Sequence, residues 1–304
     1  MCPIAAPLLL RAASALAQLA AAHPAMHRWL RSVAEAELFC SADETRLQIL
    51  FFLNDADTAR REPAAFAQLC DRLRALVPQL AGAGAQLLPG LNRGSRGKAR
   101  RNARWDGAAW ASDGLAYSAG ERIYWVSRGA FFQVNRFLVD RLVALVTASQ
   151  SGDLAWDLFA GVGLFTRALA DSFTHVVAVE AGDVAAADLA AAARGGKGRP
   201  AFEAVHSPAL DFLRARELQR ERPNLIVLDP PRAGLGPDAA EVLARIAAPR
   251  LVYVSCDPVT LARDLAIVTH AYRIVSIDLI DLFPQTFHME TVVHLHKWPG
   301  GEIV

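Results

Sequence analysis

The chain has 304 residues, of which 53% are hydrophobic, and a formal net charge of +1 at pH 7. This length is enough for one large or two modest domains with a real core, and no apolar run reaches the roughly 18 residues that span a bilayer. Four scattered cysteines argue against a secreted disulfide framework. The near-zero charge gives no global sign of a polyanionic partner. From the missing membrane span and the few cysteines we expect a soluble cytoplasmic monomer with no membrane partner.

The chain opens with an Ala- and Leu-rich stretch, "MCPIAAPLLLRAASALAQLAAA". A signal peptide would begin with a positive charge and continue without interruption, whereas this stretch lacks the charge and is interrupted by Arg11. The spacing of its apolar residues instead predicts an amphipathic helix.

The part of the chain up to about residue 128 mixes helical and alternating patterns. "SVAEAELFCS" and "TRLQILFFLND" predict adjacent strands joined near Ala42 and Asp43, and "PAAFAQLCDRLRALVPQL" has helical spacing. Cys40 and Cys70 follow these apolar patterns, so we predict that both are core residues. Residues 82–107 are rich in Gly, Arg and Asn and predict a loop. We therefore expect a small α+β domain over residues 1–128.

One segment of this first part, "NRGSRGKARRNARW", carries six basic residues and no acid. It could be a solvated loop, or it could contact RNA phosphates while Trp105 stacks on a base. The basic residues are Arg93, Arg96, Lys98, Arg100, Arg101 and Arg104.

From Ser151 onward, short apolar runs end in Gly, Pro or an acidic residue: "DLAWDLFAG", "HVVAVE", "AFEAV", "NLIVLDPP" and "RLVYVSC". Helical patterns separate several of them, over residues 184–194, 237–248 and 258–270. Strands that alternate with helices predict βαβ units and a parallel sheet, whose ligands bind beyond the carboxyl ends of the strands.

The first of these runs continues as "DLFAGVGLF", which places Asp157, Gly161 and Gly163 at a strand-to-helix turn. Glu180 closes the next strand, 17 residues beyond Gly163, where an acid can accept hydrogen bonds from both ribose hydroxyls of an adenosine. Thr166 replaces the third Gly of the dinucleotide fingerprint GxGxxG. This favours S-adenosylmethionine over NAD, with a glycine turn needed only for packing as the alternative.

The fourth run ends in "LDPPRAGLG", with Asp229 at the strand tip and two stiffening prolines after it. Its carboxylate either faces the ligand crevice or forms a turn or helix cap. Asp-Pro-Pro followed by an aromatic residue is typical of amino-group methyltransferases. Arg232 stands there instead, which suits a phosphate or base-edge contact.

The fifth run ends at Cys256, and Asp257 and Pro258 then form a good N-cap and first turn for a helix. The positive end of that helix favours the thiolate. "DLFPQTFHMETVVHL" places Glu290 at the start of an apolar run, hence at another strand edge. A thiol nucleophile and a carboxylate base beside a methyl donor form a coherent set; the alternative is a buried structural thiol.

Five ordered motifs resemble the S-adenosylmethionine-dependent RNA 5-methyluridine (uracil-C5) methyltransferases, which modify bacterial tRNA and 23S rRNA. They are "FFQVN", "DLFAGVG", "LDPPRAG", "YVSCDPVTLARDL" and "LFPQTFHME", and the match runs from about residue 128 to the C-terminus. The resemblance implies an α/β fold with a Rossmann-like class I methyltransferase domain over residues 129–304, built on a mostly parallel seven-stranded sheet.

The resemblance also implies roles for site residues. Cys256 matches the nucleophile that adds to uracil C6, and Glu290 matches the base that removes the C5 proton. Leu164 and Asp257 depart from the family pattern, which often has a polar cofactor contact and an Asn at these positions. The uridine would have to leave its stack to reach the thiol, so the basic segment and Arg232 become RNA candidates. Gln133, Phe159, Glu180 and Asp229 match cofactor contacts, alongside the turn residues Gly161 and Gly163.

Family members usually begin with a β-barrel RNA-binding domain, which we do not find here, and the rRNA branch adds four cysteines that hold an iron–sulfur cluster. "CPIAAPLL" resembles the segment with the last of these cysteines, with Cys2 as the match. One thiolate cannot hold such a cluster, so we expect neither a cluster nor another metal site in a chain that is either a short member or truncated at its start. We favour 23S rRNA over tRNA as substrate. The competing hypotheses for function are a catalytically silent RNA- or cofactor-binding protein and an N-methyltransferase.

Overall fold

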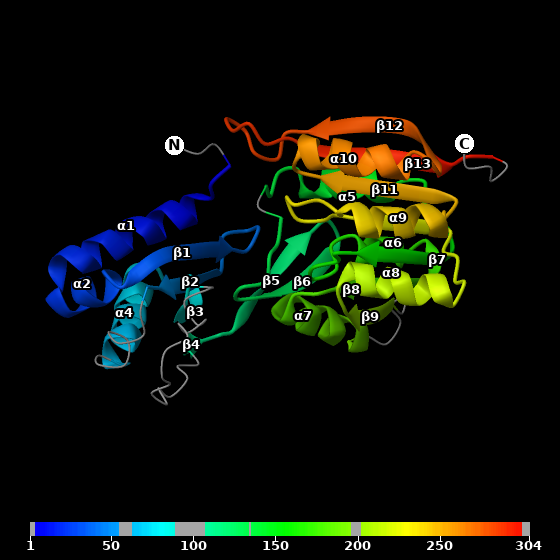
Figure 1. The fold of residues 1–304 in the computed structure, drawn as a ribbon. Coiled ribbons are helices and arrows are strands. Elements are labelled where there is room, and N and C mark those ends of the chain that lie inside the picture. The colour runs from blue at the N-terminus through cyan, green and yellow to red at the C-terminus, as the bar shows by residue number, and fades with distance from the viewer. Residues whose placement is uncertain (1–3, 55–62, 89–106, 134, 196–201, 300–304) are drawn as a thin grey trace, which may run out of the picture. The chain divides into compact units, whose positions relative to one another are not determined.

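The computed structural model describes residues 4–54, 63–88, 107–133, 135–195 and 202–299 (Figure 1). The chain divides into two units, one of Met1–Ser118 with Trp125–Gly129, the other of Ala119–Tyr124 with Ala130–Val304. A hairpin of β5 (Gly114–Ala119) and β6 (Arg122–Ser127) supplies residues to both units.

The first unit contains a four-stranded sheet in the order β1-β2-β3-β4. The strands β1 and β2 are adjacent, as predicted, and pair antiparallel, while β2 and β3 are parallel and β4 returns antiparallel to β3. Cys40 and Cys70 are buried in the unit's core, which confirms their predicted packing role. The elements are α1 (Pro7–Ala22), α2 (Pro24–Leu30), β1 (Val33–Cys40), β2 (Leu47–Leu53), α4 (Pro63–Leu76), β3 (Leu80–Leu87) and β4 (Ala108–Ala111).

The prediction of a loop over residues 82–107 is wrong at its start, because β3 (Leu80–Leu87) is an inner strand of this sheet. Its glycines allow close approach of neighbouring groups: a Cβ atom on Gly82 would lie 1.9 Å from the carbonyl oxygen of Ser112, and one on Gly84 2.7 Å from Nε of Arg128. Glycine here serves packing rather than a turn. Residues 89–106 of the predicted loop lie outside the described residues.

The second unit is built on a seven-stranded sheet in the order β12-β13-β11-β10-β7-β8-β9 (Figure 1). Its neighbours pair in parallel from β11 through to β9, whereas β13 runs antiparallel to both β11 and β12. This confirms the predicted α/β fold with a mostly parallel sheet. The strands are β7 (Gly152–Leu158), β8 (Phe173–Glu180), β9 (Phe202–His206), β10 (Leu225–Leu228), β11 (Arg250–Ser255), β12 (Tyr272–Ile280) and β13 (Glu290–Lys297).

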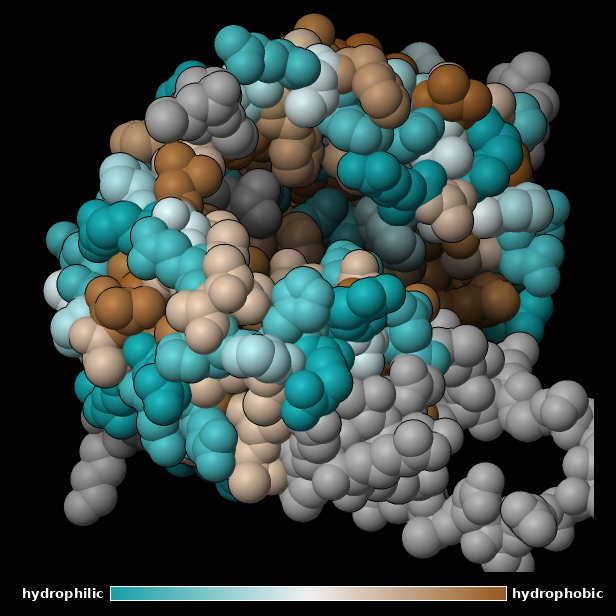
Figure 2. Space-filling model, turned by 90° about the vertical axis from the view of Figure 1, so that its left-hand side faces the viewer, coloured by the Kyte–Doolittle hydropathy of each residue, from teal (hydrophilic) through white to brown (hydrophobic). Residues whose placement is uncertain are grey.

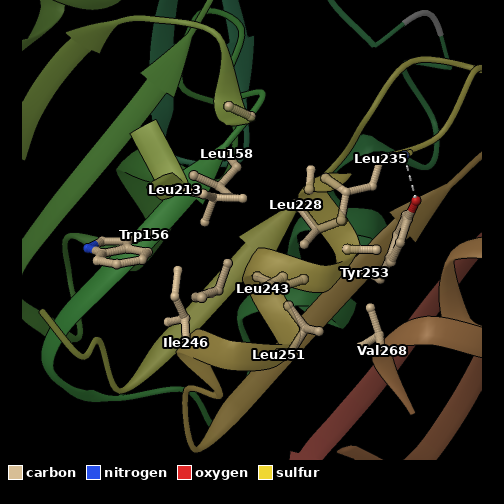
Figure 3. Close-up of a cluster of buried hydrophobic side chains, with 14 of the residues drawn as sticks. Trp156, Leu158, Leu213, Leu228, Leu235, Leu243, Ile246, Leu251, Tyr253 and Val268 are labelled. Atoms are coloured by element: carbon tan, nitrogen blue, oxygen red, sulfur yellow. Dashed lines mark hydrogen bonds between the residues drawn. The ribbon is translucent and has the colours of Figure 1, made fainter. Parts of the chain in front are cut away.

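Helices cover both faces of this sheet, and the central strand β10 is buried along its whole length. One core layer joins strand residues such as Trp156, Leu228 and Tyr253 to Leu243 of a covering helix (Figure 3). This packing fixes the strands, and with them the ends that carry polar side chains. The helices are α5 (Val139–Thr147), α6 (Thr166–Leu169), α7 (Asp183–Arg194), α8 (Ala209–Leu218), α9 (Pro237–Ile246) and α10 (Pro258–Val268).

Candidate active site

The parallel strands β7, β8, β10 and β11 end at one edge of the sheet, and a predicted site residue stands at or directly after each end. Leu228 pairs with both Leu158 and Tyr253, so the ends of these strands lie side by side. The antiparallel strand β13 begins at this same edge, because its Thr291 pairs with Ser255. The residue before Thr291 is Glu290 and the residue after Ser255 is Cys256, so the sheet brings the predicted base and nucleophile together.

The turn after β7 adopts a left-handed backbone at three predicted cofactor residues, Phe159 (φ 62°), Gly161 (φ 56°) and Gly163 (φ 92°). The two glycines differ in surroundings. A Cβ atom on Gly163 would lie 3.0 Å from Cδ1 of Leu189 in α7, whereas one on Gly161 would meet nothing within 4 Å. Gly163 therefore serves close packing, while open space beside Gly161 lets a ligand approach the backbone.

Glu180, at the end of β8, is held by this turn. Its Oε2 accepts a hydrogen bond of 2.8 Å from the backbone N–H of Gly161, and its Oε1 accepts one of 2.7 Å from that of Gly182. A carboxylate oxygen can accept more than one hydrogen bond, and the side chain is partly exposed. Glu180 is thus fixed in place with capacity left for ribose hydroxyls.

Asp157, two residues before Phe159, is the functional candidate that sequence reasoning left without a role. It is fully buried, and its Oδ2 accepts a 2.5 Å hydrogen bond from the hydroxyl of Thr166, while its Oδ1 has no hydrogen-bond partner among the described residues. Burial raises its pKa to about 7, against the lowering effect of Thr166. The unpartnered oxygen suits a cationic donor such as the amino group of S-adenosylmethionine, so the residues of this turn fit that cofactor. The sequence feature that could have identified Asp157 as a site residue is an acidic residue shortly before the glycine turn.

The segment "FFQVN" supplies Gln133, which is buried. Its neighbour Asn135 is also buried, and Nδ2 of Asn135 donates a 3.1 Å hydrogen bond to the carbonyl of Leu282. Leu282 belongs to the segment between β12 and β13, so Asn135 ties the stretch that carries Gln133 to the approach to Glu290.

Glu290 and Asp229 are carboxyls in an environment that disfavours their charge. Glu290 is 3% exposed, and burial raises its pKa to about 7. Burial also raises the pKa of Asp229 well above its usual range, and the charges of Glu290 and Asp157 raise it further. A carboxylate base whose pKa lies near neutral pH is well matched to proton abstraction.

Cys256 is partly exposed at the same edge. Burial is the largest influence on its thiol and raises its pKa, the charges of Glu290 and Asp229 add to this, and the charge and hydrogen bond of Arg232 oppose it. The helix end stays a predicted influence in favour of the thiolate, while the net pKa is raised because desolvation and two carboxylates outweigh the effect of Arg232. The predicted N-cap is confirmed: Oδ1 of Asp257 accepts 2.9 Å hydrogen bonds from the backbone N–H groups of Val259 and Thr260.

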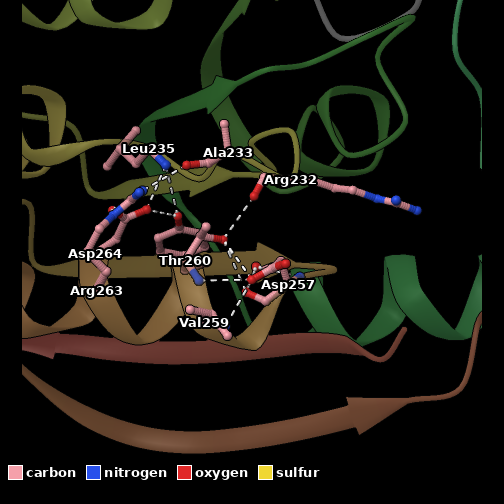
Figure 4. Close-up of polar contacts among 10 residues, drawn as sticks. Arg232, Ala233, Leu235, Asp257, Val259, Thr260, Arg263 and Asp264 are labelled. Carbon is pink, nitrogen blue, oxygen red and sulfur yellow. Dashed lines mark hydrogen bonds and ion pairs between the residues drawn. The ribbon is translucent and has the colours of Figure 1, made fainter. Parts of the chain in front are cut away.

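A buried network joins α10 to the loop that carries Asp229 and Arg232 (Figure 4). Oδ2 of Asp264 accepts 2.6 Å hydrogen bonds from the Tyr253 hydroxyl and the Leu235 backbone, and its Oδ1 accepts from Arg263. The network was not predicted, because its members come from β11, α10 and the loop after β10.

The start of α10 holds Arg232. The Thr260 hydroxyl donates a 3.1 Å hydrogen bond to the Arg232 carbonyl, while the exposed Arg232 side chain extends away from the network (Figure 4). The backbone of Arg232 is thus tied to the helix that follows Cys256.

The remaining predicted residues, Cys2 and the basic segment Arg93, Arg96, Lys98, Arg100, Arg101 and Arg104, lie outside the described residues. None of the helices in the described ranges is long and apolar enough to cross a bilayer. On the face shown in Figure 2, hydrophobic side chains are scattered among hydrophilic ones.

Part of this chain is similar to known proteins. Residues 202–298 match the model of the family described as tRNA (Uracil-5-)-methyltransferase. Over this region the chain is similar to the RNA uracil-C5 methyltransferases. An uncharacterized RNA methyltransferase of Thermotoga maritima is 41% identical over 172 residues, covering 55% of this chain and 38% of that protein. The 23S rRNA (uracil(1939)-C(5))-methyltransferase RlmD of Hahella chejuensis is 36% identical over 174 residues, covering 55% of this chain and 39% of that protein.

The fold agrees with this family. The crystal structure of Pyrococcus abyssi tRNA (uracil-54, C5)-methyltransferase in complex with S-adenosyl-L-homocysteine has a TM-score of 0.59 at 22% identity and covers 85% of this chain and 58% of that chain. At this identity the likeness establishes a methyltransferase fold. The chain spans about two fifths of the length of the curated relatives it matches.

Proposed function

We propose that this chain methylates C5 of a uridine in RNA with S-adenosylmethionine as methyl donor. The observation that carries the proposal is the meeting of Cys256 and Glu290 at one sheet edge, beyond the end of β11 and at the start of the antiparallel strand β13. A nucleophilic thiol and a buried carboxyl whose pKa is about 7 are the two groups that substitution at a uracil carbon needs.

In the proposed reaction, the Cys256 thiolate adds to C6 of uracil, and the electron pair of the C5–C6 double bond moves to form an enolate. C5, now nucleophilic, would form a bond to the methyl group of the donor, whose methyl–sulfur bond would break with its electron pair on the sulfur, so that S-adenosylhomocysteine leaves. Glu290 then removes the proton from C5, the double bond re-forms and the C6–sulfur bond breaks, which returns the thiolate. Arg232 offsets the carboxylates that oppose the thiolate.

S-adenosylmethionine supplies an electrophilic methyl group when bound. Three groups of this chain would hold it: Glu180 at the ribose, the open backbone at Gly161, and the unpartnered Oδ1 of Asp157 at the amino group. Asp229, whose loop lies beside them, and Gln133 and Phe159 complete the proposed contacts.

We propose 23S rRNA as the substrate, on the strength of relatives from Hahella chejuensis and Marinomonas posidonica that carry the name 23S rRNA (uracil(1939)-C(5))-methyltransferase. The description of the matching family model favours tRNA as the second candidate. Methylation of 23S rRNA and of tRNA transcripts, compared at equal uridine concentration with product nucleosides identified by mass spectrometry, separates the two.

The test of the chemistry is release of tritium from RNA labelled at uridine C5, in the presence of S-adenosylmethionine. We expect release by the wild type and none by Cys256→Ala. Glu290→Gln should form the covalent adduct with RNA without releasing tritium, because addition needs only Cys256. Wild-type protein that binds S-adenosylmethionine but releases no tritium from either RNA would refute the proposed activity and favour a silent binding protein.

A further inference from the structure

Phe287 is the most exposed large hydrophobic side chain among the described residues, at 90% of its surface. Its ring contacts a neighbouring ring. The centroid lies 4.1 Å from that of His288, with the rings tilted by 42°, and the His288 ring is 6.1 Å from that of Phe283 in an edge contact. One side of Phe287 is therefore supported by an aromatic row, while nearly all of its surface meets solvent.

The position of this ring links it to the site. Phe287 lies three residues before Glu290, in the segment between β12 and β13 that crosses the ligand-binding edge of the sheet. The charge of His288 helps to lower the pKa of Asp257, the residue after Cys256, after the larger effects of the helix backbone. The segment thus approaches the start of α10, where Val259 is also exposed, at 76%.

The charges on this part of the rim indicate which part of an RNA strand it suits. Asp257 and the exposed Asp281 carry negative charge, which disfavours backbone phosphates beside Phe287. The positive charge of Arg232 acts instead at Cys256. A base has an uncharged aromatic face, and aromatic side chains stack on unpaired bases whatever their identity. A uridine that leaves its stack to reach a buried site exposes the faces of the bases beside it.

We propose that Phe287 stacks on an unpaired RNA base adjacent to the target uridine and so fixes the strand over Cys256. This inference rests on the proposed function for its ligand. A phenyl ring carries no acid, base or nucleophile, so Phe287 would bind substrate and take no part in the chemical steps.

The test uses the full chain and a single-stranded RNA oligonucleotide with one uridine, in which each neighbouring base is replaced in turn by an abasic site. Binding is measured by fluorescence anisotropy for the wild type, Phe287→Ala, Phe287→Trp and Leu218→Ala. Leu218 is the matched control, because it is 85% exposed and ends α8, which leads back to the start of β10 at the opposite edge of the sheet.

Stacking on one base predicts that Phe287→Ala weakens RNA binding by roughly 5- to 150-fold, while Phe287→Trp and Leu218→Ala bind as the wild type does. One abasic position should weaken wild-type binding by a similar factor and leave Phe287→Ala unaffected. Affinity for S-adenosylmethionine should not change.

Two outcomes would overturn the inference: additive effects of Phe287→Ala at every abasic position, or no binding of the oligonucleotide by the wild type. Because the measurement is of binding, it is independent of tritium release. A failure of the proposed chemistry and a failure of the stacking contact are therefore distinguishable.

Discussion

The buried carboxyl of Glu290 predicts a specific dependence of stability on pH. Burial raises its pKa from 4.5 to about 7, so between these values the folded protein holds a proton that the unfolded chain releases. The resulting stabilisation is fully present below pH 4.5 and is lost as the pH rises through 7. Each tenfold change in proton affinity is worth about 1.4 kcal/mol. The interval between 4.5 and 7 therefore corresponds to a stabilisation of the folded state of about 3 kcal/mol.

Substitution of Glu290 by Gln removes the titrating group and keeps its shape. We therefore expect that the free energy of unfolding, measured by urea denaturation at pH 5 and at pH 8, falls by about 2.5 kcal/mol less in Glu290→Gln than in the wild type. Glu241→Gln is the control, because the Glu241 side chain is 63% exposed on α9 and its ion-pair partner Arg245 stays charged over this pH range; it should follow the wild type. An equal loss in Glu290→Gln and the wild type would refute the assignment of a protonated, buried Glu290.

Three further predictions concern neighbouring groups. Burial and two carboxylates raise the pKa of Cys256, so the rate of its alkylation by iodoacetamide, monitored by mass spectrometry, should increase up to and beyond pH 9. Arg232→Ala should slow this alkylation at each pH. An alkylation rate unchanged in Arg232→Ala would contradict the assigned contact. Asp264→Ala, which breaks a buried charged network, should lower the free energy of unfolding by about 3–5 kcal/mol, whereas Glu217→Ala at an exposed ion pair should cost under about 1 kcal/mol. Asp157→Asn should weaken S-adenosylmethionine binding at least tenfold by calorimetry, and wild-type affinity should fall as the pH drops below 7, where Asp157 takes up a proton; affinity that does not vary with pH would contradict its role.

The fold of the second unit could be predicted because its strands are short apolar runs with clear punctuation. The run "NLIVLDPP" became β10 (Leu225–Leu228) and "RLVYVSC" became β11 (Arg250–Ser255), each with its polar end residue at the ligand-binding edge. The strand β3 (Leu80–Leu87) escaped prediction because its Ala and Gly residues carry almost no apolar pattern. It forms a strand since its neighbours approach too closely for larger side chains, and that is a property of the tertiary structure.

The site could be predicted only in part. The identities of Cys256 and Glu290 follow from motifs, but the local context suggested a thiolate-favouring helix end, and it missed the carboxylates that raise the pKa of the thiol. Those carboxylates come from other strands. In the same way, the role of Asp264 depends on Tyr253 and on the backbone of Leu235, and no spacing in the sequence brings these residues together.

The direction of β13 is what makes the proposed chemistry possible. In a wholly parallel sheet, the first residue of a strand lies at the edge opposite the ligand site, because ligands bind beyond the carboxyl ends. Since β13 runs antiparallel between β11 and β12, its first residue, Glu290, lies instead beside the end of β11 and Cys256. The buried side chains that follow, among them Val292 and Val293, hold the strand in the core and offset the cost of burying Glu290. The burial that raises the pKa of Glu290 thus depends on a strand reversal, and this reversal places a distant glutamate, the proposed base, beside the thiol.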